Sequence, residues 1–282
     1  MYCQAGVTRI KTIHRRRFVS PYTVREEVSK AIDRLDDSGV RVDYVSFVPT
    51  GEPTLDLGLG LQIRLVLDLG VKVAVFTNSS LLWRRDVVED LMDADYISVK
   101  IDAGSQQVFR EINRPHERIV LSKVIRGLKM LCKEYSGVIE AETMVVRGVN
   151  DSSREFEAIA NILAELECIK VHIILTPVRP PALSWVKPPE SRRIELLAAM
   201  VKAYGIRARV LSELEPSGYG GSLNDAIEDL LSMIRVHPIP LDRLRDYCRK
   251  RGVDETRVLE EVLRRGGRLV RFNGKLFIRF ES

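Results

Sequence analysis

Short β-branched segments alternate with helical segments along the chain up to residue 204. In the helical segments, apolar residues recur every three to four positions, as they do on one face of an amphipathic helix. Strands that alternate with helices form parallel sheets, and right-handed crossovers curl such sheets into a barrel. The pattern predicts an α/β fold, a partial TIM-like barrel of the (β/α)6 type. We expect strands at 42–48, 71–77, 95–101, 138–146 and 169–175, and helices at 24–35, 59–69, 84–92, 121–134, 153–166 and 190–204.

The chain opens without the strand that such a barrel needs. It begins with a loop, Tyr2-Cys3-Gln4-Ala5-Gly6, and continues with a basic segment, so that the first helical pattern starts near Thr23. Without a preceding strand, the sheet is expected to present an exposed edge. We therefore expect the first strand of the barrel to be missing from the printed sequence.

The composition is that of an ordinary folded protein. Of the 282 residues, 45% are hydrophobic and 29% are charged, and no run of 18 apolar residues occurs. These values exclude fibrous, disordered and helical membrane proteins. No apolar segment near the start marks an export signal, so the expected location is the cytoplasm. The cysteines follow no disulfide spacing, and we expect Cys132, Cys168 and Cys248 to be small buried hydrophobic residues.

A second unit follows the barrel pattern. A stretch rich in Ser, Gly and Pro at 213–222 is the expected linker between a core domain at 1–212 and a module at 223–282. The module has three short helical patterns and then two alternating runs around Asn273-Gly274, the strongest short hairpin signal. Three helices before a hairpin predict a winged-helix-like module. The expected helices are 223–235, 241–251 and 256–265, and the hairpin strands are 268–272 and 275–280.

The excess positive charge lies at the C-terminal end. Residues 235–282 contain 13 Lys and Arg against 7 Asp and Glu, whereas residues 1–234 contain 31 against 32. A basic module of this kind favours a polyanion, most simply nucleic acid, as its partner, and a protein-binding wing is the alternative. A second basic run, 15–17, is typical of a solvated surface, although it can also meet a phosphate backbone. The candidate contacts in the module are Arg264, Arg265, Arg268, Arg271 and Lys275.

Each expected strand ends in polar or glycine-rich residues. In parallel barrels the carboxyl ends of the strands form one rim, where active sites lie. Turn chemistry alone explains any one of these ends, but five on one rim predict a polar mouth. Glu140 and Glu142 share one face of their strand, and in a barrel this face can point inward. His172 is more simply a structural histidine than a ligand. The strand ends read 49–54, 77–80, 100–104, 147–151 and 176–177.

These segments match a known family in order along the chain. Tyr2-Cys3-Gln4-Ala5-Gly6 resembles the end of the Cys-x-x-x-Cys-x-aromatic-Cys loop of radical S-adenosylmethionine (SAM) enzymes. Residues 50–54, Thr-Gly-Glu-Pro-Thr, resemble that family's Gly-Gly-Glu-Pro motif, with Thr50 in place of the first glycine. The segments at 76–81, 99–104, 112–116, 146–151 and 175–181 also match. Residues 1–190 are therefore similar to the radical SAM branch that contains the archaeal tRNA wyosine synthases.

The resemblance implies two cofactors, a [4Fe–4S] cluster and SAM, and an electron donor. In the family, one electron from the cluster cleaves SAM to a 5′-deoxyadenosyl radical, which takes a hydrogen atom from the substrate. Such an enzyme is an oxidoreductase, and tRNA is the substrate class that the branch implies. Cys3 matches the third of three cluster cysteines. The other two would stand immediately before Met1 and five residues before it, so the resemblance implies a natural start upstream.

The resemblance also implies a set of SAM contacts at the strand ends. The segment 50–53 matches the motif that receives the methionine amino group. Asn78, Asp102 and Arg114 match contacts to the carboxylate or ribose, and the strand ends near Val146 and Thr176 match those that flank the adenine. Glu142 is either a contact to SAM or substrate or the partner of a basic side chain. The implied SAM contacts are Thr50, Gly51, Glu52, Pro53, Thr77, Asn78, Lys100, Asp102, Arg114, Glu142, Val146 and Thr176.

A second hypothesis comes from a different class. If two cluster cysteines are absent, the chain is a catalytically incomplete radical SAM fold that serves as a nucleic-acid-binding or protein-binding module. Brown colour and absorption near 400 nm after anaerobic purification mark the enzyme, and a colourless protein marks the binding module. Neither hypothesis includes a membrane partner.

Overall fold

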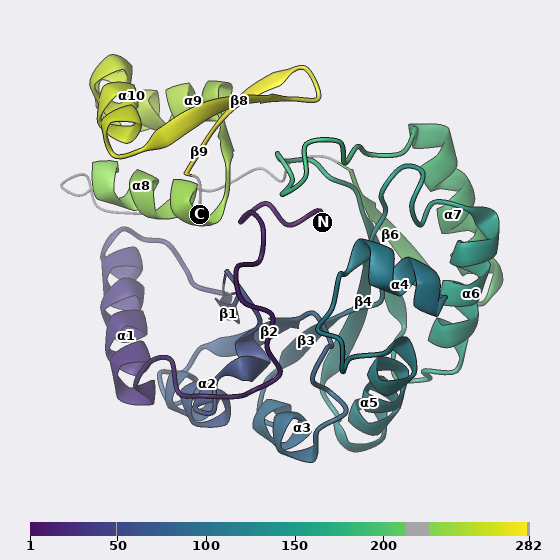
Figure 1. Cartoon of the computed structure of the whole chain (residues 1–282). Coiled ribbons are helices and arrows are strands. Elements are labelled where there is room, and N and C mark those ends of the chain that lie inside the picture. Colours follow the sequence, from purple (N-terminus) through teal and green to yellow (C-terminus); the bar gives the residue numbers. More distant parts are fainter. Residues whose placement is uncertain (49, 213–225, 281–282) are drawn as a thin grey trace.

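The computed structural model describes residues 1–48, 50–212 and 226–280, and it contains a barrel-like unit and a small module (Figure 1). The expected linker at 213–222 lies outside the described residues, as do residues 223–225 of the first expected module helix. Among the described residues, no helix combines the length and the apolar character that crossing a bilayer requires. The domain boundaries remain predictions.

Six parallel strands form the curved sheet at the centre of the larger unit. Their order in the sheet is β1-β2-β3-β4-β5-β6, the order in which they occur in the chain. The five expected strands are confirmed, each shorter than its apolar run by one to three residues. The strand that sequence reasoning missed is β6, in which two arginines interrupt the apolar pattern. The strands are β1 (Tyr44–Phe47), β2 (Lys72–Thr77), β3 (Tyr96–Lys100), β4 (Val138–Met144), β5 (Val171–Leu175) and β6 (Arg207–Leu211).

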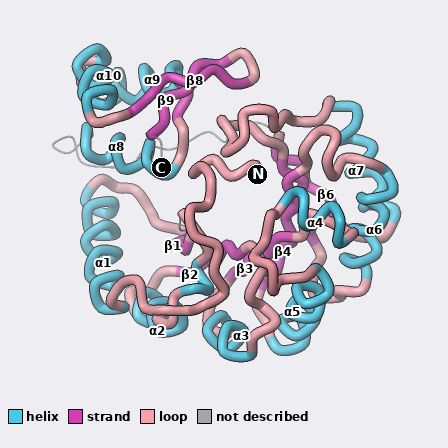
Figure 2. Tube along the Cα trace, viewed as in Figure 1, coloured by secondary structure: helices cyan, strands magenta, loops and turns pink. Residues whose placement is uncertain are grey.

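Helices cover the outer face of this sheet, while loops and the first residues of the chain lie across its open end (Figure 2). All six expected helices form. Sequence reasoning missed α4, a seven-residue helix between β3 and α5. The helices are α1 (Pro21–Asp37), α2 (Leu59–Leu67), α3 (Arg85–Leu91), α4 (Gln106–Ile112), α5 (Leu121–Glu134), α6 (Ser153–Ala164) and α7 (Ser191–Ala203), with a short 3-10 helix, η1 (Pro53–Leu55), after β1.

The sheet does not close into a full barrel, because β1 and β6 do not pair with each other. Strand β1 forms one edge and pairs only with β2 among the described strands. The side chains of β1 are exposed or half-buried, whereas four of the six residues of β2 are buried. The main core lies between the sheet and its helices, where residues such as Val75, Ile97 and Phe156 are fully buried.

The C-terminal module has a core of its own. Tyr247, Val262 and Ile278 belong to a cluster separate from the barrel core. The expected hairpin forms, and Asn273 and Gly274 both take the positive φ that its tight turn requires. Sequence reasoning missed β7, a two-residue strand that pairs with β9. The module contains α8 (Ala226–Val236), β7 (Ile239–Pro240), α9 (Leu241–Arg251), α10 (Glu255–Arg264), β8 (Gly267–Phe272) and β9 (Lys275–Phe280).

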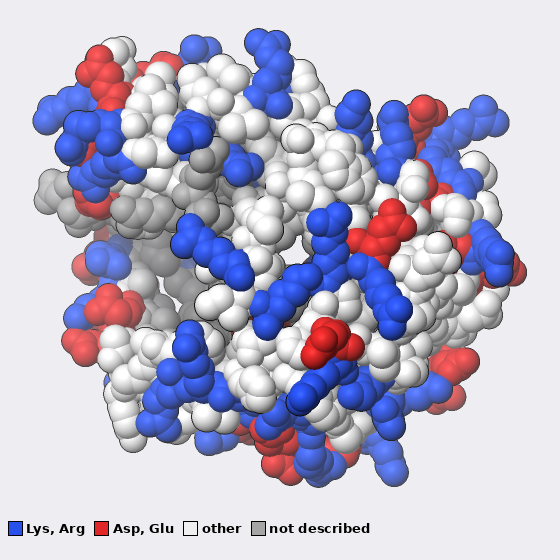
Figure 3. Space-filling view, viewed as in Figure 1, with Lys and Arg blue, Asp and Glu red and all other residues white. Residues whose placement is uncertain are grey.

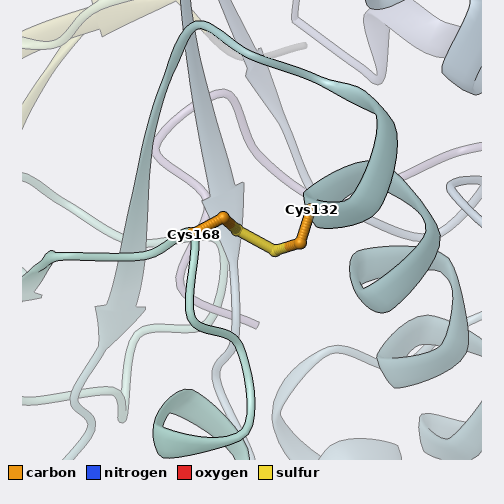
Figure 4. The surroundings of a disulfide bond; sticks show 2 residues. All are labelled: Cys132 and Cys168. Carbon is orange, nitrogen blue, oxygen red and sulfur yellow. A yellow bond between two sulfur atoms is a disulfide. The ribbon is translucent and has the colours of Figure 1, made fainter.

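Two of the cysteines form a disulfide, which corrects the expectation that both are unpaired buried residues. Cys132 near the end of α5 is bonded to Cys168 in the turn before β5, with a Cα–Cα distance of 5.3 Å (Figure 4). The two residues are 36 positions apart, so their spacing in the sequence gave no sign of the bond. The expectation holds for Cys248, which is free and buried in the module.

Removal of this disulfide is expected to destabilise the barrel. For a closed loop of this length, the loss of loop-closure entropy in the unfolded chain corresponds to about 4 kcal/mol. A double replacement, Cys132→Ala with Cys168→Ala, should lower the thermal midpoint by several degrees. Dithiothreitol should produce the same shift in the native chain and none in the variant. Cys3→Ala, which changes an exposed free thiol, is the control, and equal midpoints for all three proteins would contradict the disulfide's role.

Candidate functional site at the carboxyl edge of the sheet

Glu52 anchors the loop that follows β1. Its Oε1 accepts hydrogen bonds from the Thr54 hydroxyl at 2.7 Å, the Thr54 amide at 3.2 Å and the Thr77 hydroxyl at 2.6 Å. Its Oε2 accepts one from the Asn78 amide at 2.7 Å. Burial raises the pKa of Glu52, and these hydrogen bonds oppose the rise. Three of these four donors reach Oε1 and one reaches Oε2, so Oε2 keeps capacity for a further donor.

Gly51, next to Glu52, borders open space. A methyl group placed on its Cα would meet no other atom within 4 Å, and its backbone φ is not in the left-handed region. The fold therefore does not itself require glycine at this position. Thr50 and Gly51 are exposed while Pro53 is buried. The backbone at 50–51 therefore faces solvent, and the residues that follow it anchor it to the protein. A ligand can approach this main chain closely, as glycine permits.

Asp102, just beyond β3, connects several parts of the rim. Its Oδ2 accepts hydrogen bonds from the Tyr2 hydroxyl and from Asn113 Nδ2 at 2.7 Å, and its Oδ1 accepts one from the Met144 amide at 2.8 Å. Burial and the adjacent carboxylate raise the pKa of Tyr2 well above its ordinary value. With only 2% of its surface exposed, Asp102 is a buried carboxylate satisfied from within the protein.

Asn150 fixes the loop after β4. Sequence reasoning included it in the matching segment 146–151 but gave it no role of its own. Its Nδ2 donates to the carbonyls of Asp102 at 2.8 Å and Met144 at 2.9 Å, and its Oδ1 accepts from the Val146 amide at 2.8 Å. The predicted contacts Val146 and Thr176 are both buried here. Their place at the ends of β4 and β5 agrees with the predicted rim.

Charged side chains face the inside of the curved sheet. Lys100 Nζ lies 2.8 Å from Glu142 Oε2, and both side chains are mostly buried. The Lys100 ammonium also lies 5.9 Å from the centre of the Tyr2 ring. One layer deeper, the Tyr96 hydroxyl donates to Glu140 Oε2 at 2.8 Å. Of the two hypotheses for Glu142, the structure contains the ion pair with a basic side chain.

Other predicted contacts are spread along the rim. Thr77 is buried at the end of β2, and Asn78 is exposed beside it. Arg114 is exposed in the turn after α4 and has a positive φ of 48°. The structure thus gathers the segments at 50–53, 77–78 and 100–102 into neighbouring strand ends, because β1, β2 and β3 are adjacent in the sheet.

Arg15 is buried, unlike the solvated run that its two arginine neighbours suggest. Its guanidinium donates to Asp86 at 2.9 Å, to Asp90, and to the carbonyls of Thr54 and Asp56, both at 2.8 Å. Only 4% of its side chain is exposed. Together with Arg84, it holds the pKa of Asp86 at about 2. Arg15 therefore fastens the N-terminal loop to η1 and α3.

His172 lies on the helix-covered face of β5, away from the inside of the barrel. Its Nε2 is 2.7 Å from the Thr143 hydroxyl, and its ring packs 6.1 Å from that of Phe156. Its Nδ1 has no hydrogen-bond partner among the described residues. Complete burial lowers the pKa of His172 to about 3. The structural assignment of this histidine is consistent with these contacts.

The family model of the radical SAM superfamily matches residues 1–163, more than half of the chain. The chain belongs to the radical SAM superfamily. A UPF0026 protein of Methanocaldococcus jannaschii, MJ1312, is 33% identical over 281 residues, which are 98% of this chain and 86% of that protein. A probable dual-specificity RNA methyltransferase RlmN of Thermosynechococcus vestitus is 24% identical over 62% of this chain and 52% of its own length.

A solved structure supports the fold. The structure of TYW1 with a lysine-pyruvate adduct bound superimposes with a TM-score of 0.53, at 19% identity, over 72% of this chain and 70% of TYW1. At this identity the likeness concerns the fold alone. The partial TIM-like barrel predicted from the alternating pattern is thereby confirmed as an α/β fold with a six-stranded parallel sheet.

Radical SAM proteins use a [4Fe–4S] cluster and SAM. Of the cysteines in this sequence, Cys3 is free and exposed at the rim, two are bonded to each other and Cys248 is buried in the module. Among the described residues, no three His, Cys, Asp or Glu side chains are grouped to hold a metal. Since a cluster needs several thiolates, the printed residues do not fit it. The space beside Gly51 is open, as it is at several other exposed glycines.

The predicted nucleic-acid contacts lie in two settings. Arg264 and Arg265 end α10 and bond to Glu261, and Arg265 also reaches Glu228 at 2.8 Å. Both are therefore partly neutralised. The other three, Arg268, Arg271 and Lys275, lie on the β8–β9 hairpin and are exposed.

The buried His172 is expected to make stability depend on pH. Its pKa is about 3 in the folded protein, so in acid the unfolded chain takes up a proton first and stability falls as pH drops below 6.5. Between pH 7 and pH 5 this linkage removes about 2 kcal/mol. Urea unfolding at both pH values should show that loss in the native chain and lack it in His172→Gln. His14→Gln, which changes an exposed histidine, should behave like the native chain, and an unchanged pH dependence in His172→Gln would contradict the assignment.

Proposed function

We propose that this protein binds SAM at the carboxyl edge of β1 to β4 and acts as a radical SAM oxidoreductase on RNA. The observation that carries the proposal is the open backbone at Gly51, next to the hydrogen-bonded carboxylate of Glu52. In this proposal, Thr50 and Gly51 present main-chain groups to the methionine end of SAM. Glu52 positions that main chain, and its Oε2, which accepts one hydrogen bond, can also receive the methionine ammonium.

The remaining predicted contacts take positioning or lining roles in this proposal. Asp102 holds Tyr2 and the start of the loop after β4, so it shapes the rim from below. Asn78 and Arg114 are exposed and available to the ligand's carboxylate or ribose. Lys100 and Glu142 neutralise each other inside the barrel, where a substrate group can compete for either.

Filling the space beside Gly51 should block SAM without harming the fold. Gly51→Ala and Gly51→Val add side chains that meet no protein atom near the Cα, so thermal midpoints should stay within about 1 °C. In titration calorimetry with SAM, Gly51→Val should bind about tenfold or more weakly than the native chain, a loss of about 1.4 kcal/mol. Gly51→Ala should fall between them. Equal affinities for all three proteins would place SAM elsewhere.

The RNA part of the proposal rests on the module and on a relative. The relative with 24% identity is named an RNA methyltransferase. In the module, the element order helix, strand, helix, helix, strand, strand is that of a winged helix, which supports this assignment for α8 to β9. The motif resemblance to the wyosine synthase branch favours tRNA among RNAs.

Charge removal on the hairpin tests the module. Replacing Arg268, Arg271 and Lys275 by Ala should weaken tRNA binding and reduce the slope of log affinity against log salt by about 2 to 3. Fluorescence anisotropy at several salt concentrations measures both quantities. Replacing Arg264 and Arg265 should matter less, because Glu261 already pairs with them. If the hairpin variant keeps the native affinity and slope, the module does not bind RNA.

A second candidate function follows from the cysteines. Among the described residues at the rim, Cys3 supplies the one free thiol. This observation favours a binding protein with a radical SAM fold. The two functions differ in whether two further thiolates accompany Cys3. Intact mass and terminal peptide sequencing of the protein from its native cells supply the answer. Two cysteines that precede Met1 at the motif spacing would support the enzyme, and a native start at Met1 would support the binding protein.

A further inference from the structure

The chain before α1 carries positive charge without any negative charge. Residues 1–25 contain six Lys and Arg and no Asp or Glu. We call residues 7–22 the N-terminal strip. The strip leads from the loop with Cys3 to the first turn of α1. An acid-free basic segment of this length is a candidate surface for a polyanion.

The strip crosses the rim of the barrel. Just before it, Tyr2 bonds to Asp102 at the end of β3. Farther along, the Arg16 amide donates to the Leu55 carbonyl at 3.0 Å, and the Arg16 carbonyl accepts from the Leu57 amide at 3.1 Å, beyond β1. In Figure 1 the purple trace follows this course from the mouth to α1. The strip therefore starts at the proposed site and ends at the outer surface.

The nearest carboxylates do not neutralise the strip. Asp86 and Asp90 are occupied by the buried guanidinium of Arg15. The exposed cations Arg9, Lys11 and Arg17 make no salt bridge with an acid in the part of the chain that the structure describes. Figure 3 shows Lys and Arg side chains around the central hollow of the same face. Because Asp86 and Asp90 already pair with Arg15, they do not neutralise the exposed cations of the strip.

Exposed apolar and aromatic side chains lie among these cations. Ile10 is 75% exposed, Phe18 54% and Tyr22 68%. The Arg16 guanidinium stacks over the Phe18 ring, 4.6 Å from its centre. Base stacking on aromatic rings together with backbone contacts to cations is the way proteins bind single-stranded nucleic acid. An acidic protein partner would use the charge but has no need of stacking rings.

We propose that the N-terminal strip binds a single-stranded stretch of RNA and leads it to the mouth of the barrel. The proposal rests on the proposed function, because it names the surface that delivers that RNA. The basic hairpin of the module reaches the mouth from another direction, with Asn273 Nδ2 3.5 Å from the Pro177 carbonyl. A polymer can contact the strip and the hairpin together, and the mouth lies between them.

The test uses the full chain and a labelled single-stranded RNA of about 20 nucleotides. Replacing Arg9, Lys11 and Arg17 by Ala should lower the salt slope by about 2, since each phosphate contact in a single strand contributes about 0.7. Replacing Phe18 and Tyr22 by Ala should leave that slope unchanged and weaken binding by about fivefold or more. The matched control replaces Arg126, Lys133 and Lys202, exposed cations on α5 and α7 that also lack a salt bridge among the described residues.

The other possible results contradict either the role of the strip or the proposed function. Native affinity and slope in both strip variants, with loss in the hairpin variant, would overturn the strip but leave the proposed function intact. Equal loss in the control triple would show a non-specific charge effect and would also overturn it. If the strip variants lose binding only to poly-glutamate, the strip is a surface for an acidic protein instead. Absence of RNA binding by the native chain would overturn the RNA part of the proposed function itself.

Discussion

The buried carboxylate of Asp102 is the interaction on which the geometry of the mouth depends. A charge withdrawn from water is tolerated only when hydrogen bonds surround it. Asp102 obtains them from the N-terminal loop, from the turn after α4 and from the end of β4. Three segments far apart in the sequence therefore meet at one point. Glu52 does the same for the ends of β1 and β2, and the two carboxylates fix adjacent parts of the rim.

These hydrogen bonds change how the acidic residues of the two motifs are interpreted. A sequence motif marks Glu52 and Asp102 as functional, and their charge suggests contact with a ligand. The structure gives most of their lone pairs to donors from the protein. Oε2 of Glu52 and the main chain at Gly51 stay open. In the proposed function, the recognition surface is therefore largely backbone, and the acids determine where that backbone lies.

Much of the fold could be predicted from the sequence, because strong periodic patterns need little tertiary information. The runs of β2 and β5, for example, are β-branched and buried, and Asn273-Gly274 specifies its turn. Strand β6 was not predicted, because Arg207 and Arg209 alternate with only short apolar residues. The roles of Arg15 and Asn150 were not predicted for another reason. A run of three arginines does not tell which one is buried, and pairing across the rim appears only when the chain is folded.

The disulfide between Cys132 and Cys168 has a practical consequence for any assay of this protein. It joins α5 to the turn before β5, in the scaffold behind the strands and apart from the residues of the rim. Thiol reductants such as dithiothreitol cleave disulfides by exchange. An assay mixture that contains such a thiol would therefore change the scaffold. Rates measured under strong reduction then belong to a less cross-linked barrel, and comparisons between laboratories need the thiol state of the sample as well as its activity.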